Sequence, residues 1–213
     1  MFLMMINGYR ALTRVLIFAT ALVLGAELQA GTAEAKSAEA KSVVEKLHKT
    51  LLDVMKRADA LGYSGRYEEL APVVSASFDF DTIGQQLLGR YWAGLNADQR
   101  KLFLETFEQL STATYAARFD GFKNETFRTV SQETKGDWTI VTAELVKSDG
   151  GTVQFKYILK PAGEGWRIVN VFADGVSELA ARKAEYSTVM RDRGFDALIA
   201  RLRDKIDHYA KGA

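Results

Sequence analysis

The spacing of apolar residues changes along the chain, and this change constrains the fold more than any other feature. Before residue 121 and after residue 176, apolar residues recur every three or four positions, as on one face of a helix. Between them, four runs alternate apolar and polar residues, which is typical of half-buried β-strands. These runs are TFRTVSQET, DWTIVTAELVKS, GTVQFKYILK and GWRIVNVFAD. Helices, then strands, then helices indicate an α+β fold.

Short glycine-bearing turns join the predicted strands at Gly136, at Gly150 and at Gly163. Turns this short connect antiparallel strands. We therefore expect a four-stranded antiparallel meander wrapped by N- and C-terminal helices. The helices are predicted over 42–61, 67–75, 80–92, 97–121, 176–193 and 195–209, with breaks at Gly62 and Gly194.

The N-terminal segment has the layout of a secretory signal peptide. Arg10 and Arg14 form a basic region, VLIFATALVLGA is an apolar region, and small residues follow. The apolar run is shorter than the ~20 residues that a membrane-spanning helix needs, so an uncleaved membrane anchor fits less well. We predict a signal peptide over 1–30, cleaved after Ala30 or Ala35, a flexible lead-in over 31–41 and a single domain over 42–210. The mature protein is then exported, and a chain without cysteine suits a bacterial periplasm.

The sequence lacks the residue sets of common catalytic and metal sites. It has no cysteine, which excludes a disulfide, a thiol nucleophile and a thiolate metal site. The two histidines, His48 and His208, show no triad pattern, and we expect both to be solvated on helices. No glycine-rich loop leads from a strand into a helix. The net charge of +1 gives no reason to expect nucleic-acid binding. We predict no catalytic residue, metal or cofactor.

Asp79 and Asp81 form the carboxylate pair that is the strongest candidate for catalysis or metal binding. An enzyme of the small cone-shaped α+β type, with one of them as base, is the competing interpretation. The local pattern favours a helix start instead. With Asp79 as N-cap, Phe78 and Ile83 have the spacing of a hydrophobic staple, and Asp81 falls where the helix dipole favours negative charge. Gly84 on this helix lets another element approach closely.

Wide apolar faces on two helices and on one side of the strands predict an apolar cavity. A curved meander wrapped by helices can leave such a cavity, and a filled core in a structural adaptor is the alternative. In the last strand, Trp166, Ile168 and Phe172 are expected on one face, with Val169 and Val171 opposite. The residues expected to line the cavity are Ile83, Leu87, Tyr91, Phe103, Phe107, Leu110 and Tyr115 from the helices, Val153, Phe155, Tyr157, Trp166 and Ile168 from the strands, and Val176 after them.

Three long segments carry a resemblance to a known family. They are FDFDTIGQQLLGRYWAGLNADQRKLFLETFEQLSTATYAARFDGF, GWRIVNVFADGVSELAARKAEY and GFDALIARLRDKI. With the strands between them, the chain over 40–207 resembles the MlaC / toluene-tolerance family, the periplasmic lipid-binding auxiliary components of an ABC transport system. The resemblance implies that 42–210 is a lipid-binding domain. It implies a shuttle, not an enzyme, that carries membrane lipid between the inner and outer membranes.

The same resemblance implies partners. They are an inner-membrane transporter complex and an outer-membrane lipoprotein complex, each of which would meet a monomeric carrier.

One segment departs from the usual family pattern. After the GVS motif at 175–177 the family usually has a Tyr-Arg pair, whereas Arg182 and Lys183 stand at the aligned positions here. This form resembles the hopanoid-associated subgroup (HpnM), which leaves the cargo open between a glycerophospholipid and a hopanoid or another membrane lipid. Arg90, Arg182 and Lys183 could meet a headgroup or a partner, but a solvated surface role is typical of such residues.

Overall fold

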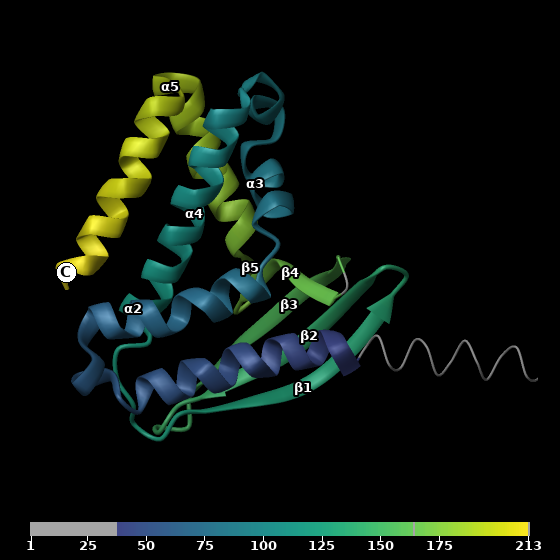
Figure 1. Cartoon of the computed structure of the whole chain (residues 1–213). Helices are drawn as coiled ribbons and strands as arrows, with labels where there is room; N and C mark the ends of the chain where they lie inside the picture. The colour runs from purple at the N-terminus through teal and green to yellow at the C-terminus, as the bar shows by residue number, and fades with distance from the viewer. Residues whose placement is uncertain (1–37, 164, 213) are drawn as a thin grey trace, which may run out of the picture. The chain divides into compact units, whose positions relative to one another are not determined.

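A five-stranded antiparallel sheet carries the helices on one of its faces (Figure 1). The computed structural model describes residues 38–163 and 165–212, and the chain from Glu39 onward forms one compact unit. The predicted signal peptide and residues 31–37 lie outside the described residues, whereas residues 38–41 are already helical. The α+β class is confirmed, with five strands in place of the predicted four.

The helices follow the predicted order with displaced ends. After a helix over 38–55 come α2 (Ala58–Ser77), α3 (Phe80–Leu88), the 3₁₀ helix η1 (Gly89–Gly94), α4 (Ala97–Arg118) and, after the sheet, α5 (Glu178–Ala210). The breaks predicted at Gly62 and Gly194 are confirmed as kinks inside α2 and α5, where these residues have φ values of 57° and 80°. Helix α4 contacts both α2 and α5, and α3 contacts α5.

The strands pair in chain order, as the short turns predicted. They are β1 (Thr126–Lys135), β2 (Trp138–Val146), β3 (Thr152–Ala162), β4 (Gly165–Ala173) and the short β5 (Val176–Ser177). The prediction that Val176 begins the last helix was wrong, because it lies in β5. Ser177 is the N-cap of α5, and its hydroxyl accepts a hydrogen bond from the backbone N–H of Ala180.

A β-bulge in β4 changes which of its residues face the helices. The register with β3 slips between Ile168 and Asn170, so Val169 is an extra residue. A bulge shifts the two-residue alternation by one. Val171 therefore pairs with Tyr157 on the helix-covered face. The prediction that Val169 and Val171 lie opposite Ile168 was wrong.

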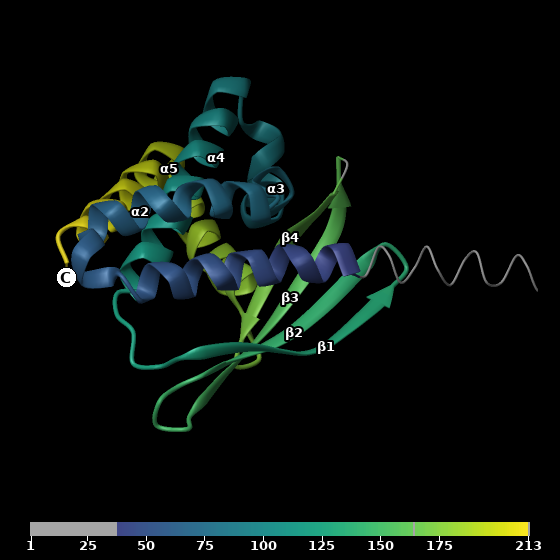
Figure 2. The ribbon, with the colours of Figure 1, turned by 60° about the horizontal axis from the view of Figure 1, so that its bottom comes forward.

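The helix over 38–55 lies along the sheet beside β1 and β2 (Figures 1 and 2), and His48 is buried in this contact. His48 is 4% exposed, its Nε2 lies 2.9 Å from the Tyr157 hydroxyl, and its ring stacks on Phe127 with centroids 4.0 Å apart. The expectation that His48 is solvated was wrong, whereas His208 is exposed as expected.

Helix α3 begins as the sequence predicted. The Asp79 carboxylate accepts hydrogen bonds from the Thr82 backbone N–H at 2.9 Å and from the Thr82 hydroxyl at 2.6 Å. Asp81 is exposed in the first turn. A Cβ at Gly84 would lie 2.5 Å from Leu104 Cδ2, so α3 and α4 approach closely at this glycine. Both aspartates therefore have the positions expected at a helix start.

Candidate binding cavity

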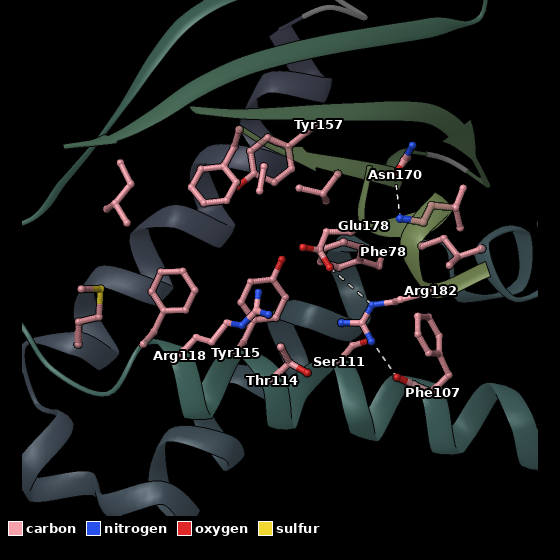
Figure 3. A pocket seen from close by; sticks show the side chains of 18 of the residues that line it. Phe78, Phe107, Ser111, Thr114, Tyr115, Arg118, Tyr157, Asn170, Glu178 and Arg182 are labelled. Atoms are coloured by element: carbon pink, nitrogen blue, oxygen red, sulfur yellow. Dashed lines mark hydrogen bonds and ion pairs between the residues drawn. The ribbon is translucent and has the colours of Figure 1, made fainter. Parts of the chain in front are cut away.

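A cavity of about 470 Å³ lies among α3, α4, the start of α5 and the sheet (Figure 3). Its volume is in the range of small-molecule sites. Side chains from the helices and from strands β2, β3 and β4 line it, and most of them are aromatic or aliphatic. Among the residues predicted to line the cavity, those that border it are Ile83, Leu87, Phe107, Tyr115, Phe155 and Tyr157. Their contact with a ligand stays a prediction.

Four predicted residues lie in the filled core and do not border the cavity. Phe103 and Leu110 of α4 are buried, and Phe103 stacks on Phe107 with centroids 6.0 Å apart. Trp166 and Ile168, at the start of β4, are also buried. The shared apolar face is longer than the cavity, so spacing alone does not tell a cavity wall from packed core.

Three predicted residues, Tyr91, Val153 and Val176, do not border the cavity. Tyr91 lies in η1, because Gly89 ends α3 with a φ of 51°, which favours glycine. The stripe from Ile83 through Leu87 therefore stops before Tyr91. Val153 is half-buried near the start of β3, and Val176 is 62% exposed.

Several lining residues were missed in the sequence. Phe78 and Phe119 each flank a helix end, and both pack on Tyr115, with ring centroids 6.1 and 5.8 Å away. Both are large aromatic residues next to the predicted apolar faces, and this position could have identified them as lining residues. Val169 and Val171 line the cavity because of the bulge in β4, which the sequence pattern does not reveal.

Exposed charged residues mark the side on which the cavity meets solvent. Three of them lie at the end of α4 or just after it, namely Arg118, Asp120 and Lys123. The fourth, Lys147, comes just after β2. All of them border the cavity and are exposed. This side therefore gives access to the cavity from water.

Arg182 borders the cavity, in contrast to the surface role expected of it. Its Nε lies 3.8 Å from a Glu178 carboxylate oxygen, and its guanidinium carbon lies 5.8 Å from the Phe107 ring centroid. Burial lowers the pKa of the guanidinium, but the neighbouring Tyr186 and Glu178 raise that pKa above its ordinary value, so Arg182 is charged. Lys183 and Arg90 are exposed and do not border the cavity.

Two tyrosines contribute hydroxyl groups to the lining. Burial raises the pKa of Tyr115 and of Tyr157 above the ordinary tyrosine value, so both stay protonated. The Tyr157 hydroxyl pairs with His48. The Tyr115 hydroxyl makes no hydrogen bond to another residue described by the structure, and Figure 3 shows it directed into the cavity.

The described residues contain no group of three or more His, Asp or Glu side chains placed to hold a metal ion. Over the same part of the chain, no helix has both the length and the hydropathy of a membrane span. What the arrangement can do chemically is hold a mainly apolar molecule and offer it a few hydrogen-bonding groups.

Comparisons with known proteins agree with this geometry. A profile of the MlaC protein family matches residues 45–204. The intermembrane phospholipid transport system binding protein MlaC of Haemophilus influenzae is 23% identical over 140 residues, which are 63% of this chain and 64% of that protein. The match thus spans less than two thirds of that relative.

A solved structure shares the fold. It is the phospholipid-binding protein from Ralstonia solanacearum in complex with a phospholipid, with a TM-score of 0.71 and 18% identity. The match covers 82% of this chain and 98% of that chain. With the profile match over most of the chain, these findings lead to one conclusion: the chain belongs to the MlaC protein family.

Proposed function

We propose that this protein binds a membrane lipid, first of all a phospholipid, in the cavity and carries it through the periplasm between the inner and outer membranes. The observation that carries the proposal is the unfilled, mainly apolar space of about 470 Å³. Because the cavity is open to water, its apolar lining is exposed unless an apolar ligand covers it, and covering it is favourable. The phospholipid named for both the Haemophilus and the Ralstonia proteins supports this cargo.

The physical need for a carrier also supports the proposal. Exposing an acyl chain to water costs about 0.8 kcal/mol per CH₂ group, so two chains of membrane length cost on the order of 20 kcal/mol or more. A carrier has to cover the chains and still release them. A mainly apolar lining does both, because apolar contacts are non-directional and the membrane offers the same kind of environment.

Family membership supports two kinds of partner for the delivery steps. One is an inner-membrane transporter complex, and the other is an outer-membrane lipoprotein complex. We propose that the protein meets each of them as a monomer. A hopanoid-like lipid is the second candidate cargo, because the segment GVSELAARKAEY resembles the hopanoid-associated subgroup of the family. The mass of an extracted lipid distinguishes the two cargoes.

Two matched phenylalanine variants test the proposed site. Phe155 borders the cavity, whereas Phe172 of the neighbouring strand pairs with Lys156, one residue along β3, and so lies on the other face of the sheet. Phe155→Glu places a carboxylate in an apolar space, where an unpaired charge is strongly unfavourable. We expect at least about tenfold less lipid per protein in an organic extract analysed by mass spectrometry, which corresponds to about 1.4 kcal/mol.

The control Phe172→Glu should keep the lipid content of the unmodified protein, with circular dichroism as the check on folding of both variants. Equal lipid in folded Phe155→Glu and Phe172→Glu would contradict the assignment of the site. An unmodified protein that carries no lipid would favour the structural adaptor.

A further inference from the structure

A charged guanidinium lies in the wall of an otherwise mainly apolar cavity. The Arg182 side chain is 22% exposed, and its closest carboxylate, that of Glu178, is 3.8 Å away. This distance is beyond hydrogen-bond length. Tyr186 is another polar group that interacts with the guanidinium, and the Phe107 ring lies beside it. One hydroxyl and one carboxylate beyond hydrogen-bond length do not accept from all five N–H groups, so the guanidinium has donors free toward the cavity.

Such an arrangement is unfavourable with a purely apolar cargo. A guanidinium carries five N–H donors, and donors that lose water without gaining an acceptor destabilise the bound state. An apolar side chain at this position would carry no such requirement. Arg182 thus changes what the cavity can accept at this point.

We propose that Arg182 is a polar subsite of the cavity and binds an oxyanion of the cargo, either a phosphate or a carboxylate. The inference rests on the proposed lipid binding and adds the chemical class of the bound group. The planar fork of N–H groups matches both oxyanions in a bidentate manner. The Tyr115 hydroxyl is the second donor, since Figure 3 shows Tyr115 and Arg182 around the same part of the cavity.

Glu178 sets the strength of the subsite. Its carboxylate is the one that pairs with the Arg182 guanidinium, at 3.8 Å, and it competes with an incoming oxyanion. The Glu178 side chain is more exposed than that of Arg182, so it can turn toward water when the cargo arrives. Removing its charge should therefore strengthen oxyanion binding.

The test compares lipids that differ in the oxyanion alone. The delipidated protein is titrated with phosphatidic acid and with diacylglycerol of the same chains, and in a second arm with a fatty acid and the matching fatty alcohol. We expect the unmodified protein to bind phosphatidic acid or the fatty acid at least about tenfold more tightly than its uncharged counterpart. The two arms tell a phosphate from a carboxylate.

Three variants assign the preference to Arg182. Arg182→Gln should bring the ratio of the two Kd values toward one, and Arg182→Lys should keep part of the preference. Glu178→Gln should increase it several-fold. Lys183→Gln, which removes the adjacent exposed cation outside the cavity, should leave it unchanged. Thermal unfolding shows whether each variant is folded.

The outcomes separate the two proposals. Binding of both members of each lipid pair with equal Kd values would overturn the oxyanion subsite, and so would a preference that persists in folded Arg182→Gln. Failure to bind any of these lipids would overturn the proposed binding of a phospholipid itself.

Discussion

At the residue scale, a buried histidine joins the N-terminal part of the fold to the cavity wall. His48 hydrogen-bonds to Tyr157, and Tyr157 borders the cavity. Burial lowers the pKa of His48 from 6.5 to about 4, so the ring is neutral at pH 7. The contact between the helix over 38–55 and the sheet therefore depends on a neutral imidazole.

The burial of His48 predicts that the free energy of unfolding decreases in acid. In the unfolded chain His48 binds a proton near pH 6.5, whereas in the folded chain it does so only near pH 4. The unfolded state is thus favoured as pH falls through this window, and the free energy of unfolding should fall by up to about 3 kcal/mol relative to His48→Gln. Urea unfolding of both proteins at pH 7 and at pH 4.5 measures the difference. Parallel pH profiles would contradict the account.

At the element scale, α3 supplies Ile83 and Leu87 to the cavity wall and depends on its first residues for its position. The backbone N–H of Asp79 donates to the Ile168 carbonyl at 3.0 Å, which ties the start of the helix to β4, while its carboxylate caps the first turn. The wall is therefore held at the point where the helix begins.

A pair of aspartate variants tests this dependence. Asp79→Ala removes the cap and should lower the free energy of unfolding by about 1–2 kcal/mol. Asp81→Ala removes an exposed first-turn charge and should cost about half as much or less. Chemical denaturation measures both values. Equal losses would show that Asp79 contributes only its charge.

Apolar spacing predicted the elements because a helix or strand turns one face to the core. Apolar residues on that face recur about every 3.6 residues in a helix and every 2 residues in a strand. It did not predict Val171 at the cavity, because a bulge depends on how β4 pairs with its neighbour. It placed Tyr91 wrongly because Gly89 ends α3 before the stripe is complete. It gave no indication that His48 is buried, since only tertiary packing brings Phe127 and Tyr157 to the ring.

At the scale of the whole molecule, the helices cover one face of the sheet (Figure 2). Between the helices and strands β2, β3 and β4 lies the cavity of about 470 Å³. In the carrier that we propose, the cargo completes the interior of the protein. Because a ligand that binds only the folded state adds to stability, the cargo should make the protein more resistant to unfolding.

Native mass spectrometry of the purified, unmodified protein tests the central claim most directly, followed by thermal unfolding before and after organic extraction. We predict a species heavier than the polypeptide by the mass of a bound lipid. Extraction should remove that lipid, and the extracted protein should have a lower Tm that added phospholipid restores. A folded protein of polypeptide mass alone, whose Tm does not respond to added lipid, would contradict the account.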